Sequence, residues 1–227
     1  YAGAIHPRKN LMNLLKAFSV FKKMQRSNWK LLLAGRLAGK YENFVESLER
    51  YKYRDDVILT GYLKEEELAE VIGSAYCLVY PSLWEGFGVP VLEAMQSGVA
   101  VITSGNSAMQ EIAEDGALYI NPNDHNDIAE KMMLVYKDER LRSELIKEGN
   151  IDIRRIYPSW VVGTGDPSLT PPHKVVRDFV TKGMLFYFSG GVSITDVESV
   201  AEAHIKAWEK GEVNGKYVTA GENLTFK

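Results

Sequence analysis

The sequence predicts an α/β fold built on a doubly wound, Rossmann-like parallel sheet that helices cover on both faces. Short apolar runs alternate along the chain with longer segments in which apolar residues recur at helical spacing. Short turns join these segments. Strands that alternate with helices in this way form parallel sheets, because a parallel strand is reached through a helical crossover. The 227 residues can hold one large domain or two small ones.

The chain is expected to open with the end of a strand, Tyr1 to Ile5, followed by a basic loop. Asn10 is a good N-cap, and the next helix is predicted from apolar residues on one face, namely Leu11, Leu14, Leu15, Phe18 and Phe21. Arg8 and Lys9 therefore stand at the entrance of a helix directly after a strand, where a doubly wound sheet holds a diphosphate. The alternative is a solvated basic loop.

Further strands are predicted from apolar runs at residues 30–35, 56–62, 77–81, 99–105 and 117–122. Helices are predicted between and after them, at residues 41–48, 64–72, 90–95, 107–115, 128–136 and 139–147. The acidic start of the segment 64–72 favours a helix N-terminus, because negative charge is stabilised by the helix dipole there.

The stretch of residues 84–95 is the centre of this pattern, because it places a glycine turn between an apolar strand and a helix. Gly86 and Gly88 bracket the turn, and Pro90 suits the first helical position, where its missing N–H costs nothing. Free backbone N–H groups and the positive end of the helix dipole then point at one spot. This arrangement predicts an anion site.

Two carboxylates flank that site, Glu85 in the turn and Glu93 about two turns into the helix. Their separation fits hydrogen bonding to hydroxyl groups on two sugar rings that flank a diphosphate. The alternative is an acidic helix start that stabilises only its own dipole.

With this pair the chain resembles the C-terminal, donor-binding domain of a retaining GT-B glycosyltransferase of the GT4 family. The mark of that family is a Glu, seven residues and a second Glu, which Glu85 and Glu93 reproduce within the expected strand, glycine turn and helix. The resemblance covers residues 1 to 149 and implies a metal-independent enzyme whose donor ligand is a nucleoside diphosphate sugar. Helix dipole and basic side chains neutralise the leaving diphosphate in such enzymes.

The resemblance also implies a role for each site residue. Glu85 would contact the transferred sugar, Glu93 the ribose, and the backbone of Gly86, Phe87 and Gly88 the sugar and phosphates. Lys9 matches the basic residue that pairs with the donor phosphates. Many relatives carry an arginine after their first glycine; here Ala4 follows Gly3, and Arg8 is the candidate substitute. Gly35, Arg36 and Tyr62 lie in loops that hold the nucleotide base in relatives, although Arg36 is equally well explained as a surface arginine.

Residues 150–227 depart from that pattern. The segments 157–166, 193–201 and 216–223 are similar to the C-terminal part of an extended short-chain dehydrogenase of the sugar-epimerase kind. The glycine fingerprint for a dinucleotide and the Tyr-x-x-x-Lys pair of such enzymes are both missing from the sequence. This part is therefore expected to be a structural α/β segment, and the whole chain a chimera, either deliberate or composite.

Composition and charge exclude several classes of function. A formal net charge of −3 and a pI near 5.9 give no electrostatic footprint for nucleic acid. No apolar run approaches the length of a membrane span. The single cysteine, Cys77, excludes an intrachain disulfide framework and allows a reducing, cytoplasmic setting. The histidines lack metal-ligand spacing, so no metal is expected, and no cofactor is required.

The sequence therefore predicts a nucleotide-sugar-binding domain. Because the acceptor domain of a GT-B enzyme is missing and Tyr1 is not preceded by Met, a fragment or processed chain that does not transfer sugar efficiently is expected. One alternative is an engineered scaffold without ligand function. Another is residual NAD(P) binding by the dehydrogenase-like segment.

Overall fold

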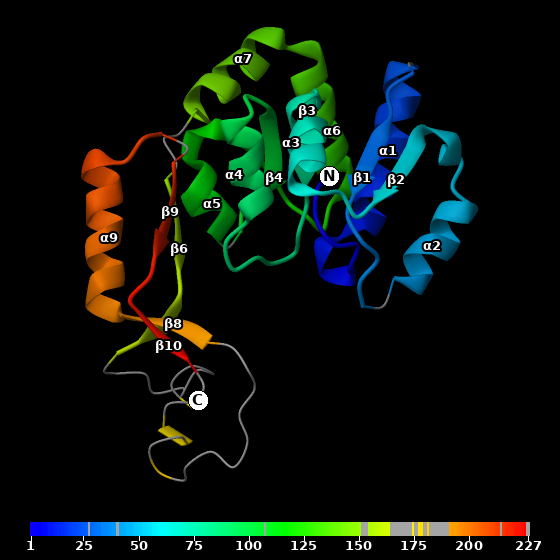
Figure 1. The fold of residues 1–227 in the computed structure, drawn as a ribbon. Coiled ribbons are helices and arrows are strands. Elements are labelled where there is room, and N and C mark those ends of the chain that lie inside the picture. The colour runs from blue at the N-terminus through cyan, green and yellow to red at the C-terminus, as the bar shows by residue number, and fades with distance from the viewer. Residues whose placement is uncertain are drawn as a thin grey trace. The chain divides into compact units, whose positions relative to one another are not determined.

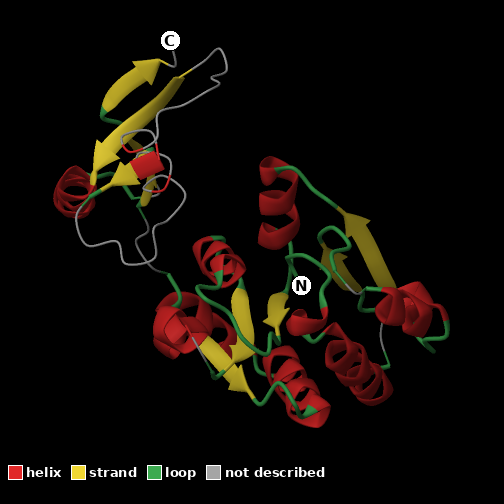
Figure 2. Cartoon of the chain, turned by 90° about the horizontal axis from the view of Figure 1, so that it is seen from below, coloured by secondary structure: helices red, strands yellow, loops and turns green. Residues whose placement is uncertain are grey.

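The computed structural model describes residues 1–26, 28–39, 41–106, 108–150, 154–163, 174, 177–178, 181, 191–213 and 215–225 (Figure 1). The chain divides into two compact units, Tyr1–Ile151 and Asp152–Lys227. Each unit has its own strands and helices (Figure 2).

The strands of the N-terminal unit are all parallel, as predicted. They are β1 (Leu31–Ala34), β2 (Val57–Gly61), β3 (Cys77–Tyr80), β4 (Ala100–Ser104) and β5 (Ala117–Ile120). One pair joins β1 to β2, and a second sheet has the order β3-β4-β5. Each strand falls within the apolar run that predicted it, and β4 is buried along its whole length.

Helices follow each strand and cover the sheets. They are α1 (Leu11–Gln25), α2 (Glu42–Glu49), α3 (Glu65–Gly73), α4 (Val89–Gln96), α5 (Ala108–Ala113), α6 (His125–Lys137) and α7 (Glu139–Glu148), with short 3-10 turns η1 (Pro7–Lys9), η2 (Arg54–Asp56) and η3 (Glu114–Gly116). Helix α1 packs against α6, whereas α4 packs against α3 and α5 (Figure 1). The apolar stripe predicted for α1 is buried in full, which gives the unit its core.

The single continuous sheet expected from the sequence is interrupted between β1 and β3. Tyr1 to Ile5 form isolated bridges, Ala2 to Ala34 and Ile5 to Leu37, in place of the expected strand end. Both bridges join this segment to the β1 side. The prediction of one continuous sheet was wrong at this point, because the bridges of this segment all run to the β1 side and the described residues include no pairing between it and β3.

The C-terminal unit contains β6 (Arg155–Pro158), β7 (Trp160–Val162), β8 (Gly191–Asp196), α9 (Val197–Lys210), β9 (Lys216–Thr219) and β10 (Glu222–Thr225). Strand β8 lies between the parallel β7 and the antiparallel β10, and β6 pairs in parallel with β9. Asp196 is the N-cap of α9, and its side chain accepts a hydrogen bond from the Ser199 amide at 2.7 Å. The segment predicted as a strand from residue 151 lies partly outside the described residues.

Among the helices that the structure describes, none combines the length and the apolar character needed to cross a membrane.

Two glycines at the ends of β1 and β2 provide a test of this architecture. A Cβ on Gly35 would lie 2.0 Å from the carbonyl oxygen of Gly3, whereas a Cβ on Gly61 would meet nothing within 4 Å. Both have positive φ, so Gly61→Ala should cost only the left-handed backbone penalty, about 1–2 kcal/mol. Gly35→Ala is expected to cost at least about 1 kcal/mol more, because the main chain must move.

Urea denaturation followed by circular dichroism measures both free energies of unfolding. Equal losses for the two variants would contradict the close approach of Gly3 to Gly35.

Candidate functional site

The central glycine turn connects β3 to α4 at the carboxyl ends of the parallel strands. Gly88 precedes α4 with a φ of 92°, and a Cβ there would lie 3.2 Å from Cγ of Met109. The left-handed backbone and the close neighbour both favour glycine at this position. Helix α4 begins at Val89, so Pro90 lies at its second position, one residue later in the helix than predicted and still within the first turn, where its missing N–H costs nothing.

The basic loop before α1, which contains Arg8 and Lys9, is joined by hydrogen bonds to the turn after β3. The Leu83 amide donates to the Arg8 carbonyl at 3.0 Å, and the Arg8 guanidinium donates to the Trp84 carbonyl at 2.8 Å. Asn10 has a left-handed backbone, and its side-chain amide donates to the carbonyls of Pro81 and Pro122 at 3.1 and 2.6 Å. The prediction that Asn10 caps α1 through its side chain was wrong, because that side chain joins three loops instead.

Three of the predicted site residues meet in one buried ion cluster. Lys9 Nζ lies 2.5 Å from Glu85 Oε1, and Arg8 Nη1 lies 2.7 Å from Glu85 Oε2. Lys9 and Glu85 are only 7% and 8% exposed, whereas the Arg8 side chain is 41% exposed. One carboxylate thus holds two cations at the carboxyl end of β3, and one of the cations remains accessible.

Tyr80, the last residue of β3, completes the cluster. Its hydroxyl accepts a hydrogen bond from Lys9 Nζ at 2.5 Å and donates to Glu85 Oε1 at 3.2 Å. Its ring stacks on Tyr1 with centroids 5.6 Å apart, and Lys9 Nζ lies 4.9 Å from the Tyr80 ring centroid. Tyr80 was not predicted as a site residue. The signal for it in the sequence is a side chain with a polar hydroxyl near the end of an apolar run.

The cluster shifts the pKa values of its members. Burial alone would raise the pKa of Glu85, but hydrogen bonds from Lys9 and Arg8 outweigh it and leave the pKa below its ordinary value of 4.5. Burial lowers the pKa of Lys9, and its contact with Glu85 offsets only part of that effect. Burial also raises the pKa of the Tyr80 hydroxyl, which therefore stays protonated at neutral pH.

The other predicted residues lie around the cluster or apart from it. Trp84, Glu85 and Gly86 line an open hollow together with Ala108, Gln110 and Glu111 of α5, three residues that were not predicted as site residues. Phe87 is exposed. Glu93 lies half-buried within α4.

Gly35 directly follows β1, and Tyr62 directly follows β2. Neither residue belongs to the ion cluster. The Gly35 amide donates to the Gly61 carbonyl at 2.9 Å, so this glycine has a structural role in the turn. Tyr62 is 77% exposed.

No group of three or more His, Cys, Asp or Glu side chains in the described part of the chain could hold a metal ion. The charged groups gathered at the site are instead suited to an anion, because two cations converge at one point.

Comparison with known proteins identifies the family of the N-terminal unit. The family described as "Glycosyl transferases group 1" matches residues 1–151. The O-antigen chain mannosyltransferase B of Escherichia coli is 32% identical over 160 residues, which cover 70% of this chain and 42% of that protein. The chain thus spans less than half the length of this curated relative.

Solved structures show the same fold. Sucrose-phosphate synthase from Thermosynechococcus elongatus is 28% identical with a TM-score of 0.58, over 65% of this chain and 38% of that one. HepE from Anabaena, solved in complex with UDP, is 17% identical with a TM-score of 0.58, over 66% of this chain and 41% of that one. The parallel-sheet α/β fold predicted from the sequence is confirmed, and it is the fold of GT-B glycosyltransferases.

The ion cluster predicts how stability depends on pH. The folded pKa of Glu85 lies below the unfolded value, so the folded chain binds fewer protons in the acid range. Stability from this carboxylate is fully present above the unfolded pKa and is lost as the pH falls through the folded pKa. At pH 7, Glu85→Gln is expected to lower the free energy of unfolding by about 1.5–3 kcal/mol, because an amide cannot neutralise the two cations.

Urea denaturation between about pH 7 and pH 2 measures this effect, and the difference from the parent chain should shrink toward the acid end. Glu144→Gln is the matched control, since its ion pair with Arg140 is exposed and should be worth about 0.5 kcal/mol or less. A Glu85→Gln loss that stays constant across the range would contradict the proposed role of the charge.

Proposed function

Because the chain belongs to the glycosyl transferases group 1 family, we propose that residues 1–149 form a donor-binding domain that holds a nucleoside diphosphate sugar. The observation that carries this proposal is the Arg8–Lys9–Glu85 cluster at the turn that connects β3 to α4. Two cations at the carboxyl end of β3 match the charge of a diphosphate.

Ligand binding would proceed by exchange of anions. The diphosphate would take the place of the Glu85 carboxylate on Arg8 and Lys9, and the released Glu85 would accept hydrogen bonds from hydroxyl groups of the sugar. Lys9 is the buried cation and would stabilise charge that develops on the leaving diphosphate. Arg8 is accessible from solvent and would meet the diphosphate first.

The remaining predicted contacts complete this picture. Glu93 would hold the ribose, and the backbone of Gly86, Phe87 and Gly88 would approach the sugar and phosphates without steric hindrance. Nothing lies within 4 Å of a Cβ placed on Gly86, so this side of the turn is open to a ligand. Gly35 and Tyr62 would border the base. No metal or cofactor is required.

The full reaction would be transfer of a hexosyl group to a hydroxyl with retention of configuration. The relatives support this class of reaction, since one is named a mannosyltransferase and a structural neighbour was solved with UDP. In a GT-B enzyme the second half of the cleft comes from an acceptor domain. The function proposed for residues 1–149 is therefore donor binding, in a cytoplasmic setting.

For residues 150–227 the proposed role is structural. The likeness of this segment to an extended short-chain dehydrogenase, and hence the chimeric origin of the chain, remains a prediction. Binding of NAD(P) by this segment is the alternative that the same experiment can test.

Calorimetric titration with UDP, GDP and ADP tests the proposal, with NAD⁺ as a fourth ligand. Lys9→Ala is expected to weaken binding of the preferred diphosphate at least about tenfold, because it removes a charged hydrogen bond worth 1.5–3 kcal/mol. Glu93→Ala should weaken it by a similar factor.

Lys16→Ala is the matched control, since Lys16 is exposed on α1 and should leave the affinity unchanged. Circular dichroism confirms that each variant is folded. Absence of binding to all three diphosphates by a folded chain would overturn the proposal and favour a scaffold without ligand function, whereas binding of NAD⁺ alone would favour the dehydrogenase-like alternative.

A further inference from the structure

Ser82 is a buried polar residue beside the ion cluster that the proposed function does not yet use. It lies between the end of β3 and Glu85, and it is 0% exposed. Its hydroxyl oxygen is closed off from solvent and has no hydrogen-bond partner among the residues that the structure describes. Buried hydroxyl groups are usually bonded, because burial removes their hydrogen bonds to water. An unpaired hydroxyl beside a ligand site is therefore a candidate for a role in the bound state.

The main chain around Ser82 is held in place by side chains from other parts of the N-terminal unit. Four consecutive carbonyls each accept a hydrogen bond from a side chain: Pro81 from Asn10 at 3.1 Å, Ser82 from Ser104 at 2.7 Å, Leu83 from Asn106 at 2.8 Å and Trp84 from Arg8 at 2.8 Å. The main chain thus cannot carry the Ser82 hydroxyl to a distant acceptor. Any partner must come from the groups next to it.

The group next to this hydroxyl is the Glu85 carboxylate. Burial raises the pKa of Glu85, and hydrogen bonds from Lys9 and Arg8 lower it. Ser82 lowers this pKa further, so its hydroxyl lies close to the carboxylate. Both carboxylate oxygens already have donors, Lys9 and Tyr80 at Oε1 and Arg8 at Oε2. The hydroxyl and the carboxylate are thus neighbours that do not bond to each other while the two cations are in place.

We propose that Ser82 is a positioning residue that donates to Glu85 once a diphosphate has bound Arg8 and Lys9. This inference rests on the proposed function, in which the diphosphate displaces the carboxylate from both cations. Ser82 is fully buried, so it would act on the ligand only through Glu85. Its hydrogen bond would keep the released carboxylate ionised and fixed where it can accept from hydroxyl groups of the sugar.

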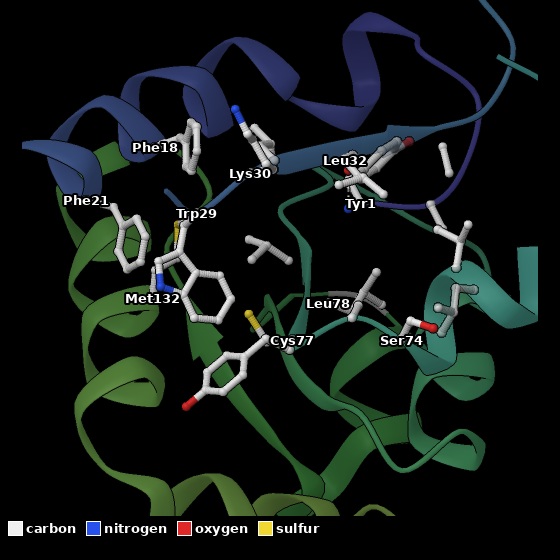
Figure 3. A pocket seen from close by; sticks show the side chains of 18 of the residues that line it. Tyr1, Phe18, Phe21, Trp29, Lys30, Leu32, Ser74, Cys77, Leu78 and Met132 are labelled. Carbon is white, nitrogen blue, oxygen red and sulfur yellow. Dashed lines mark hydrogen bonds between the residues drawn. The ribbon is translucent and has the colours of Figure 1, made fainter. Parts of the chain in front are cut away.

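The apolar surroundings of the cluster make such a replacement donor necessary. Leu78 and Tyr80 stand two positions apart on β3, so their side chains lie on the same face of the strand. Leu78 borders a largely apolar cavity of about 540 Å³, together with Phe18 and Phe21 of α1 (Figure 3). A carboxylate without partners is costly next to such surroundings. When the cations bind the diphosphate, Tyr80 remains as one donor to the carboxylate, and Ser82 would be the second.

The variant Ser82→Ala separates this role from a structural one. Removal of an unpaired hydroxyl should leave the unfolding temperature unchanged or slightly higher. Affinity for a nucleoside diphosphate sugar should fall about tenfold, because Glu85 loses a charge-assisted hydrogen bond in the complex. Calorimetric titration with UDP-glucose and GDP-mannose measures the affinity, and circular dichroism measures the unfolding temperature.

The matched control is Ser19→Ala on α1. The Ser19 hydroxyl already has a partner, since it donates to the Tyr51 hydroxyl at 2.9 Å. This variant should show the opposite pattern, a lower unfolding temperature with an unchanged affinity.

A double-mutant cycle tests whether Ser82 acts through Glu85. In a Glu85→Gln background, Ser82→Ala should change the affinity by about threefold or less, since a neutral amide oxygen gains about half as much from the same hydrogen bond. A full tenfold loss in that background would contradict the proposal, because Ser82 would then act by a route that does not involve the carboxylate.

The pH dependence is a readout that a structural role would not move. Without Ser82, the pKa of Glu85 in the complex should rise, so the variant complex takes up a proton more readily than the parent complex. The tenfold deficit should therefore shrink as the pH falls from about 8 toward about 5. Both proteins share the other titratable or charged groups around this carboxylate, so the effects of these groups cancel in the ratio of affinities: Lys9, Arg8, Tyr80, Tyr1 and His6.

The outcomes separate this inference from the proposed function. A folded parent chain that binds no nucleoside diphosphate and no nucleotide sugar would overturn both. If the parent chain binds and Ser82→Ala binds equally well, only the role of Ser82 is wrong. A Ser82→Ala variant with a lower unfolding temperature and a pH profile parallel to that of the parent would make Ser82 a structural residue and would also overturn the inference.

Discussion

The Glu85 carboxylate is the group on which the arrangement of the N-terminal unit depends. A buried charge is costly unless opposite charges and hydrogen bonds surround it, and Glu85 is surrounded by Lys9, Arg8 and Tyr80. These contacts require the loop before α1 to lie against the turn after β3, although about 76 residues separate the partners in the chain. The cluster therefore fixes two loops that the strands alone would leave independent, and it places their polar groups at one edge of the sheet.

Much of this fold was predictable from the sequence, because its determinants are local. The apolar stripe of α1 follows a helical period, and the run 77–81 is too short and too apolar for anything but a buried strand or helix segment between turns. Gly88 and Pro90 specify the turn into α4 by their backbone preferences. The ion pair between Lys9 and Glu85 was not predicted. The family resemblance assigned both residues to contacts with one ligand, and it did not indicate a contact between them.

The features that escaped prediction are set by distant contacts. Nothing in the sequence around Asn10 distinguishes a helix cap from a side chain that bonds to Pro81 and Pro122, because the carbonyls of these prolines become neighbours only in the folded chain. The interruption between β1 and β3 is of the same kind. An apolar pattern shows that a strand is buried, but it does not show which strand lies at its other edge.

The close approach of Gly3 to Gly35 has a consequence for the evolution of such chains. The atom that a side chain at position 35 would strike is a main-chain oxygen, so no substitution elsewhere can make room for it. A neighbour with a bulky side chain can mutate to a smaller residue, whereas a carbonyl cannot. Glycine at this position is thus a signature of how two turns cross, and it would persist in a descendant of this fold that had lost its ligand altogether.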